Sequence, residues 1–282
     1  MFLLTNLLEW GRAELHAHGI SSAALDAEVL LCHVTGLSRT ALFLSHQSAA
    51  DAEVSKLYRQ AIGKRASRMP VAYITGMREF MAIDFIVNSD TLIPRPDSEV
   101  MVEAAMHYMA DRDGVYQILD LGTGSGCLGL SLLSVYQRSQ ATLLDQSEKA
   151  LEVAKQNAVR LGLGHKVEFV QSNWCAALPP SKGYDIILCN PPYISHDAIL
   201  MPDVSLYEPH TALFAPEDGY ACYKEIASQL KGHMHPQSRA FFEVGQGQAP
   251  MVAEMFVRCG YEVLAIHNDL SGIARVVIVG LF

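Results

Sequence analysis

The chain has 282 residues, of which 50% are hydrophobic and 18% are charged. This length and composition predict a globular protein with a substantial core, built as two domains or as one large domain with an appendage. The formal net charge of −9 gives no general attraction for a polyanion, so we expect no direct nucleic-acid binding without a local basic patch. The apolar runs are too short to cross a bilayer, and the first residues lack the basic segment of a signal peptide. We therefore expect no membrane association.

The six cysteines are scattered singly, without a C-x-x-C pair, and most stand in apolar surroundings. This usage favours reduced thiols in a cytoplasmic protein over a disulfide framework or a zinc site. Two H-x-H pairs, His16/His18 and His233/His235, could bind a metal, but no carboxylate or cysteine clusters with them. We therefore predict no metal site. The cysteines are Cys32, Cys127, Cys175, Cys189, Cys222 and Cys259.

Residues 1–70 are predicted to form a bundle of four small helices. Apolar spacing predicts a first helix that ends near Gly11, a second helix that Gly36 stops, and a longer helix that includes Val54 and Ile62. A bundle of this size would be marginally stable alone. We therefore expect contacts with the rest of the chain to stabilise this helical domain.

Residues 71–96 are predicted to form a hairpin linker. The sequence PVAYITG, which begins at Pro70, breaks the helical pattern. The segments REFMAIDFIVN and TLIPRPDSE follow, and their β-rich, partly alternating residues predict an extended hairpin between two domains.

In residues 97–282, strands alternate with helices, most plainly around a helix predicted over 148–161. Such alternation predicts an α/β fold, with a parallel sheet and helices on both of its faces. The closing sequence YEVLAIHNDLSGIARVVIVG predicts an antiparallel hairpin on the sheet edge. The predicted parallel strands are 117–120, 141–145, 166–171, 185–190 and 239–244.

A glycine-rich loop follows the first of these strands, in the sequence ILDLGTGSGCLGL. Gly122, Gly124 and Gly126 allow a tight turn close to a ligand, and the helix that opens after them offers free N–H groups. About 20 residues further on, Asp145 ends the next strand, where a carboxylate can accept hydrogen bonds from ribose hydroxyls. The pattern indicates a cofactor that contains a nucleoside.

The loop fits two cofactor patterns and also a plain βα turn. Gly124, Gly126 and Gly129 satisfy G-x-G-x-x-G, the dinucleotide fingerprint. Read from Asp120, the same loop gives acidic-x-G-x-G-x-G, the pattern of S-adenosylmethionine (SAM) sites. An acid beside the ligand would suit a cation and repel a phosphate. The loop alone leaves the cofactor undecided.

The sequence YDIILCNPPY ends a predicted buried strand with an amide, two prolines and an aromatic ring. Asn190 stands at the carboxyl end of that strand, where doubly wound sheets bind ligands. Its side-chain oxygen and the carbonyl oxygen of Pro191 could accept both N–H bonds of a planar NH₂ group, which would aim the nitrogen lone pair at a methyl donor. Pro191 and Pro192 stiffen the loop and remove backbone donors, and Tyr193 offers a face for stacking. The motif favours methyl transfer to an amide or amino nitrogen.

Together these motifs resemble the protein-(glutamine-N5) methyltransferases of peptide-chain release factors, the PrmC or HemK family. The likeness covers nearly the whole chain and includes PVAYITGMREF, DLGTGSG, NPPYI, LYEPHTAL and FFEVGQGQ. The linker IPRPDSE resembles the release-factor branch more than the branch that methylates a glutamine of a ribosomal protein.

The resemblance implies a helical N-terminal domain that recognises the substrate, a hairpin linker, and a seven-stranded, Rossmann-like class I SAM-dependent methyltransferase domain. It also implies methyl transfer from SAM to the side-chain amide of the glutamine in the release factor's Gly-Gly-Gln loop. The release factor would be the protein partner.

The resemblance carries site residues onto this chain one by one. Asp145 would hold the SAM ribose, Trp174 would border the adenine, and Asn190, Pro191, Pro192 and Tyr193 would grip the glutamine amide, with Asn190 also beside the cofactor. The loop residues that would line the methionine portion of SAM are Gly122, Thr123, Gly124, Ser125 and Gly126.

Two positions depart from the family pattern, and three others have open roles. Gln146 replaces the usual aliphatic residue, and Asn173 replaces the usual aspartate, although its oxygen can still accept from an adenine amino group. Arg95 could reach the SAM carboxylate, the substrate or a structural partner. Glu208 and Glu243 could frame the pocket or cap backbone.

Other functions stay open from the residues alone. A nucleobase NH₂ would fit the same cradle, so adenine in DNA or RNA is an alternative substrate, against which the acidic charge argues. A SAM-binding scaffold would have no use for acceptors aimed at N–H bonds. A nicotinamide-dependent dehydrogenase fits the glycines, but no acid or base for hydride transfer accompanies them.

Overall fold

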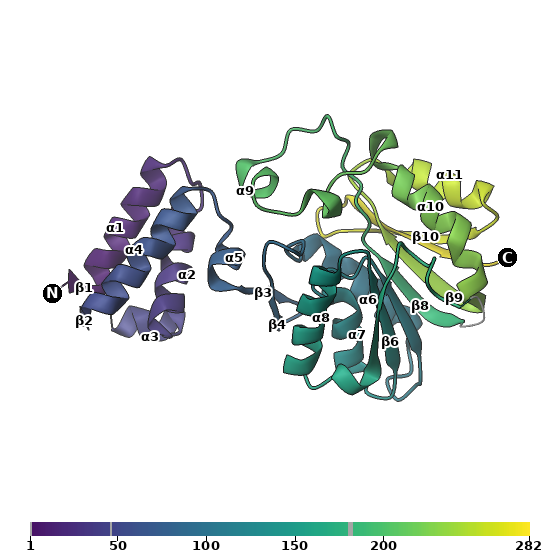
Figure 1. Cartoon of the computed structure of the whole chain (residues 1–282), viewed down its shortest axis with the longest axis horizontal. Helices are drawn as coiled ribbons and strands as arrows, with labels where there is room; N and C mark the ends of the chain where they lie inside the picture. Colours follow the sequence, from purple (N-terminus) through teal and green to yellow (C-terminus); the bar gives the residue numbers. More distant parts are fainter. Residues whose placement is uncertain (1, 46, 180–182) are drawn as a thin grey trace. The chain divides into compact units, whose positions relative to one another are not determined.

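The computed structural model describes residues 2–45, 47–179 and 183–282. Within it the chain forms two compact units, each described here by itself (Figure 1). Residues 1–77 together with 200–207 form the helical unit, and residues 78–199 together with 208–282 form the sheet unit.

The helical unit consists of short helices around one apolar core. The second helix ends at Thr35, and Gly36 follows it in the left-handed conformation at φ +71°, as its place in the sequence predicted. Asp51 caps the fourth helix by accepting a hydrogen bond from the Val54 N–H at 2.7 Å. The elements of this unit are β1 (Phe2–Leu3), α1 (Leu4–Ala17), α2 (Ala23–Thr35), α3 (Arg39–Leu44), β2 (Ala49–Ala50), α4 (Ala52–Ala66), α5 (Val71–Thr75) and α9 (Pro202–Ser205).

Helix α1 does not end near Gly11, as the sequence predicted, but continues to Ala17. The reason is packing against α4. A Cβ atom on Gly11 would lie 2.2 Å from the Tyr58 hydroxyl oxygen, so glycine serves there to let the two helices approach. Glycine costs a helix interior about 1 kcal/mol, and the contact with the buried Tyr58 offsets it.

A buried arginine ties the distant segment 200–207 into the helical unit. The Nε atom of Arg65 lies 2.6 Å from Oδ2 of Asp26, and its Nη1 atom lies 2.7 Å from Oδ2 of Asp203. Arg65 is only 6% exposed, so its positive charge is stabilised by these two carboxylates in place of water.

The predicted hairpin is present, but a short helix precedes it. Residues 71–75 form α5, although the sequence predicted that the helical pattern would be broken there; Pro70 starts this turn and Gly76 ends it at φ +74°. Strands β3 (Met77–Phe80) and β4 (Ile83–Ile86) then pair. Met81 and Ala82 between them both have positive φ, which a two-residue hairpin turn of this kind requires.

The sheet unit is built on a seven-stranded sheet in the order β10-β11-β9-β8-β5-β6-β7. The pairs from β9 through β8, β5 and β6 to β7 are parallel, and β11 pairs antiparallel with both β9 and β10. The strands are β5 (Gln117–Leu121), β6 (Gln140–Asp145), β7 (Val167–Gln171), β8 (Tyr184–Cys189), β9 (Met234–Glu243), β10 (Glu262–Asn268) and β11 (Ala274–Gly280).

Helices cover both faces of this sheet (Figure 1), each over its own apolar core. Alternate residues of each strand feed the two cores; Ile118 packs on one side and Leu119 on the other. The first face carries α6 (Glu99–Tyr108), α7 (Cys127–Val135) and α8 (Glu148–Arg160), and the second carries α10 (Ala221–Leu230) and α11 (Ala249–Arg258). Short 3₁₀ turns are η1 (Pro96–Ser98), η2 (Gly164–Lys166), η3 (His210–Ala212), η4 (Glu217–Gly219) and η5 (Lys231–His233).

The fold confirms the predicted α/β class and corrects two details. Strand β9 starts at Met234, five residues before the predicted 239, with an irregular register against β8 around Pro236. The closing hairpin is antiparallel, but only β10 lies at the edge, since β11 lies between β9 and β10. No helix in the described part of the chain is long and apolar enough to cross a membrane.

Candidate active site

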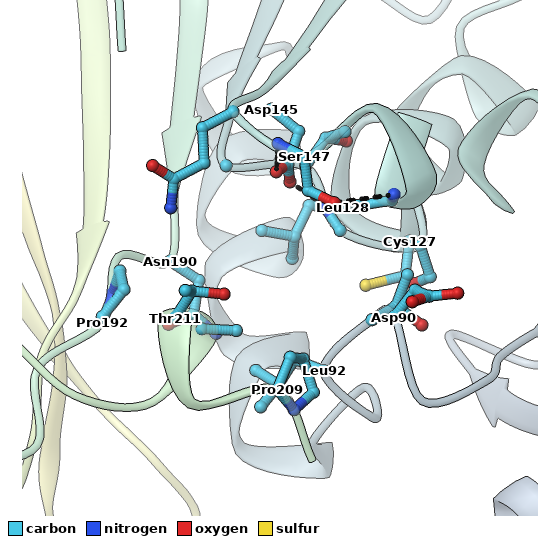
Figure 2. A pocket seen from close by; sticks show the side chains of 18 of the residues that line it. Asp90, Leu92, Cys127, Leu128, Asp145, Ser147, Asn190, Pro192, Pro209 and Thr211 are labelled. Carbon is cyan, nitrogen blue, oxygen red and sulfur yellow. Dashed lines mark hydrogen bonds between the residues drawn. The ribbon is translucent and has the colours of Figure 1, made fainter. Parts of the chain in front are cut away.

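A cavity opens at the carboxyl ends of the parallel strands, in the sheet unit. Its empty space, open solvent included, is about 930 Å³. It lies where the strand order reverses between β5 and β8, the position at which open α/β sheets bind ligands. Its lining includes Asp90, Thr91, Leu92, Arg95, Ser98, Gly122, Thr123, Gly124, Ser125, Cys127, Asp145, Ser147, Asn173, Trp174, Asn190, Pro192, Pro209 and Thr211 (Figure 2).

Asp145, at the end of β6, holds the glycine loop by a hydrogen bond. Its Oδ2 accepts the Gly124 N–H at 2.9 Å, and its Oδ1 accepts the Ser147 N–H at 2.9 Å (Figure 2). Burial raises the pKa of this carboxyl, and the hydrogen bonds from the backbone oppose that rise. Gly122 and Gly124 have φ of +67° and +55°, which favours glycine at both positions. The loop is therefore fixed in shape by a residue that itself faces the cavity.

Asp120 does not face the ligand space, contrary to the argument that it would act beside the ligand. It is completely buried, and its Oδ2 accepts from the Thr123 hydroxyl at 2.7 Å and the Gly129 N–H at 3.0 Å. Burial raises the pKa of Asp120 to about 6, against those two bonds. Asp120 holds the loop and the start of α7 from behind.

The NPPY residues follow β8 beside the glycine loop, but only part of the motif lines the cavity. Asn190 and Pro192 do so, and they lie near Thr211 in Figure 2. Pro191 is buried and lies outside the lining. Tyr193 also lies outside the lining; it is partly buried and packs against the second core. Stacking by Tyr193 and acceptance by the Pro191 carbonyl therefore stay predictions.

The predicted cofactor residues are brought together with one exception. Gly122, Thr123, Gly124 and Ser125 line the cavity with Asp145 and Trp174. Gly126 does not, because it caps α7; a Cβ there would lie 2.9 Å from Leu130 and 3.3 Å from Ala154. Its glycine is needed for packing and for its φ of +83°.

Glu225 on α10 holds the two lining residues that follow β7. Its Oε1 accepts from Nδ2 of Asn173 at 2.6 Å, and its Oε2 accepts from Nε1 of Trp174 at 3.3 Å. Because the Asn173 amide nitrogen is engaged, its oxygen is the atom left to accept from a ligand.

A buried carboxylate lies behind NPPY. Glu243, the last residue of β9, accepts the Tyr193 hydroxyl on Oε1 at 3.3 Å. Burial raises the pKa of Glu243, while the nearby hydroxyls of Ser98 and Tyr193 and the charge of Arg275 oppose that rise. Burial likewise raises the pKa of Tyr193. Ser98 also accepts from Nδ2 of Asn190 at 3.4 Å.

Sequence reasoning left Arg95, Glu208 and Glu243 without assigned roles, and the structure describes each. Nη2 of Arg95 lies 2.6 Å from Oε1 of Glu208, whose Oε2 accepts the Ile93 N–H at 3.1 Å. Arg95 lines the cavity as well, so it is both paired and available to a ligand. The motifs IPRPDSE, LYEPHTAL and FFEVGQGQ contain these three residues, but a motif does not show which residues its side chains contact.

The sheet order, the glycine loop and the acid that ends β6 define a class I methyltransferase fold. A solved methyltransferase from Pyrococcus furiosus has this fold, with a TM-score of 0.52 at 16% identity over 80% of this chain and 95% of that one. The PrmC N-terminal domain profile matches residues 6–76, and the methyltransferase small domain profile matches 99–202.

The release factor glutamine methyltransferase of Cereibacter sphaeroides is 38% identical over 265 residues, which cover 93% of each chain. The chain therefore belongs to the release factor glutamine methyltransferase family, which confirms the resemblance. The bifunctional methyltransferase of Rickettsia typhi is 33% identical over 98% of this chain. The chain spans only 57% of that relative's length.

Proposed function

We propose that this chain transfers a methyl group from SAM to the side-chain amide nitrogen of the glutamine in the Gly-Gly-Gln loop of peptide-chain release factors. The observation that carries the proposal is the juxtaposition of Asn190 with the glycine loop and Asp145 in one cavity. Family membership supports both the cofactor and the substrate. Because release factors act on ribosomes, we also propose a cytoplasmic location.

The residues present fit SAM. The loop from Gly122 to Ser125 offers a backbone cradle, Asp145 faces the cavity as a ribose acceptor, and Trp174 borders it with an aromatic ring. A Cβ on Gly122 would lie 3.4 Å from the Trp174 ring, an ordinary van der Waals distance, so the ring lies close to the loop backbone there. Bound SAM would supply a methyl group already activated by a sulfonium. No group of three or more possible metal ligands occurs among the described residues, and a metal-free reaction stays a prediction.

The chemical difficulty lies with the acceptor, because an amide nitrogen shares its lone pair with the carbonyl and is a poor nucleophile. The Asn190 oxygen would accept one substrate N–H, and the Pro191 carbonyl would accept the other. Both acceptors favour the positive charge that develops on nitrogen as the N–C bond forms and the C–S bond breaks. The proton then leaves the nitrogen for water, so the residues contribute position and electrostatics.

We further propose the division of labour that the sequence predicted: residues 1–70 recognise the folded release factor, 71–96 link, and 97–282 carry out the transfer. The match of the PrmC N-terminal domain profile to residues 6–76 supports a dedicated N-terminal part. The compact helical unit, with its own core, supports it as well.

The proposal is tested by incubating the full chain with radiolabelled SAM and a purified release factor. The same release factor with its loop glutamine replaced by alanine is the matched control, and a bare DNA duplex tests the nucleobase alternative. We expect label in the intact release factor alone. Label that persists after the glutamine is replaced, or that enters DNA, would contradict the proposal.

A further inference from the structure

We propose that Gln248 is a positioning residue for the methyl transfer, because its side-chain amide holds the peptide bond that ends the NPPY loop. This role rests on the proposed function and deepens it. Gln248 is the last residue of FFEVGQGQ, a motif whose closing glutamine has no role in the proposed transfer. It lies outside the cavity lining, so it acts through the loop.

The NPPY loop has few backbone donors of its own. Pro191 and Pro192 carry no N–H group, so hydrogen bonds from their own backbone nitrogens cannot hold them. The proposed acceptors, the Asn190 oxygen and the Pro191 carbonyl, must nevertheless stay in place, since a misplacement of about 1 Å can cost about 100-fold in rate. Their positions therefore depend on how the two ends of the loop are anchored. At one end, Cys189 of β8 pairs with Phe242 of β9.

At the other end, the peptide bond between Tyr193 and Ile194 is held at both of its polar groups. Its N–H group, which belongs to Ile194, donates to the carbonyl oxygen of Leu213 at 3.0 Å. Its carbonyl oxygen, which belongs to Tyr193, accepts from Nε2 of Gln248 at 3.0 Å. Gln248 thus supplies the anchor on the carbonyl side of this peptide.

The Gln248 amide makes this contact in one direction only. Its Oε1 accepts the Gly245 N–H at 2.9 Å, so its Nε2 is the end that faces the Tyr193 carbonyl oxygen. A backbone N–H only donates and a carbonyl oxygen only accepts, so an amide matches both partners at once. A carboxylate in its place would still accept from Gly245 but would set oxygen against oxygen at Tyr193.

Two glycines make room for this contact. A Cβ on Gly245 would lie 2.8 Å from Oε1 of Gln248. A Cβ on Gly219 would lie 2.1 Å from the Tyr193 carbonyl oxygen and 2.9 Å from Nε2 of Gln248. The backbone of Gln248 is itself fixed, since its carbonyl accepts the Val252 N–H of α11 at 3.0 Å. Three separate segments of the sheet unit are therefore built around one hydrogen bond.

The test uses the full chain with SAM and a release factor, and compares wild type with Gln248→Met and Gln248→Glu. Methionine keeps the length of glutamine and removes the amide, whereas glutamate keeps one acceptor and replaces the donor with a second acceptor. Gln246→Met is the matched control, since Gln246 is a glutamine of the same motif but is exposed. The readouts are the single-turnover rate at saturating release factor, the Kd of S-adenosylhomocysteine by calorimetry, and the free energy of unfolding in urea.

We expect Gln248→Met to lower the single-turnover rate about 10-fold, and Gln248→Glu to lower it about 50-fold, because an ionised carboxylate also repels the Tyr193 carbonyl. The Kd of S-adenosylhomocysteine should stay within about twofold of wild type in both variants. Gln246→Met should keep the wild-type rate. A residue that only stabilised the fold would lower the free energy of unfolding and leave the rate of the folded enzyme unchanged.

Three results would overturn the role of Gln248: a wild-type rate in Gln248→Met, a rate in Gln248→Glu no lower than in Gln248→Met, or a loss of cofactor affinity as large as the loss of rate. A control variant as slow as Gln248→Met would overturn it as well. If Gln248→Glu fails to fold, Gln248→Met still decides. A wild-type chain that does not methylate a release factor would instead refute the proposed function, whereas an active wild type with equally fast variants would refute the role of Gln248 alone.

Discussion

Asn173 shows how a departure from the family pattern can be accommodated by one neighbour. Its amide nitrogen donates to Glu225, which leaves its oxygen as the acceptor for a ligand and adds no second negative charge beside Glu225. An aspartate at this position would place a carboxylate against Glu225. The pair suggests that Asn173 and Glu225 should be altered together.

We predict that Asn173→Asp weakens binding of S-adenosylhomocysteine about fivefold, because like charges meet at a partly exposed site where such interactions are worth about 1 kcal/mol. Adding Glu225→Gln should restore the affinity, since its amide can donate to the new carboxylate. Calorimetry measures all three proteins. Equal affinity of Asn173→Asp and wild type would show that the pair does not matter for the cofactor.

Some site residues could be predicted from sequence, and others could not, for a physical reason. The loop glycines and Asp145 follow a fixed local pattern, so their residue types and spacing identify them as cofactor-binding candidates. Ser98, Glu225 and Glu243 are ordinary polar residues whose partners lie far away along the chain. Only folding brings them to the site. The role proposed for Asp120 was wrong because a strand's last residues can face inward as well as outward.

Helix α8 joins three segments of the sheet unit through one buried side chain. Asn157 accepts the Ile86 N–H at 2.7 Å and donates to the carbonyl oxygens of Ile86 at 3.0 Å and Ser125 at 2.8 Å. The hairpin strand β4 and the glycine loop are thereby both tied to α8. The loop's shape depends on a helix as well as on its own glycines.

Asn157→Ala should lower the free energy of unfolding by about 3 kcal/mol, because it leaves buried backbone groups without partners. Urea denaturation measures the change. Lys155→Ala on the same helix is the control and should shift stability by less than about 0.5 kcal/mol, since the ion pair that Lys155 makes with Glu152 is exposed. Similar stabilities for the two variants would remove Asn157 from this role.

Most elements were predictable because periodicity is a local property. Four of the five parallel strands and the helix over 148–161 were predicted within one residue of their observed ends, while β9 starts five residues earlier than predicted. The failures occurred where tertiary packing overrides local signals. Gly11 was predicted to end the first helix, but it lies within that helix and against Tyr58. Residues 71–75 were predicted to break the helical pattern, but they form a short helix between Pro70 and Gly76.

The helical unit draws in a segment from the middle of the methyltransferase sequence. Residues 200–207 belong to it, with Asp203 paired to buried Arg65 and the Tyr207 hydroxyl bonded to the Ser67 carbonyl at 2.5 Å. That segment begins only a few residues after NPPY. No sequence pattern signalled that the chain would return to the N-terminal unit.

We predict that deleting residues 1–70 impairs methylation of a folded release factor far more than methylation of a short Gly-Gly-Gln peptide. The deletion should be combined with Asp203→Asn, because it removes the arginine that neutralises Asp203. The value of kcat/KM should fall about 100-fold for the folded substrate and little for the peptide, with an unchanged Kd for S-adenosylhomocysteine. Equal losses for both substrates would assign the helical unit a structural role.

The account depends most on the Asn190 oxygen as an acceptor for the substrate amide. The most direct measurement is the single-turnover rate of Asn190→Ala on a release factor, with the affinity for S-adenosylhomocysteine measured in parallel. We predict a loss of about 100-fold or more in rate, the usual cost of one transition-state contact, with cofactor affinity nearly unchanged. A rate equal to that of wild type would contradict the account.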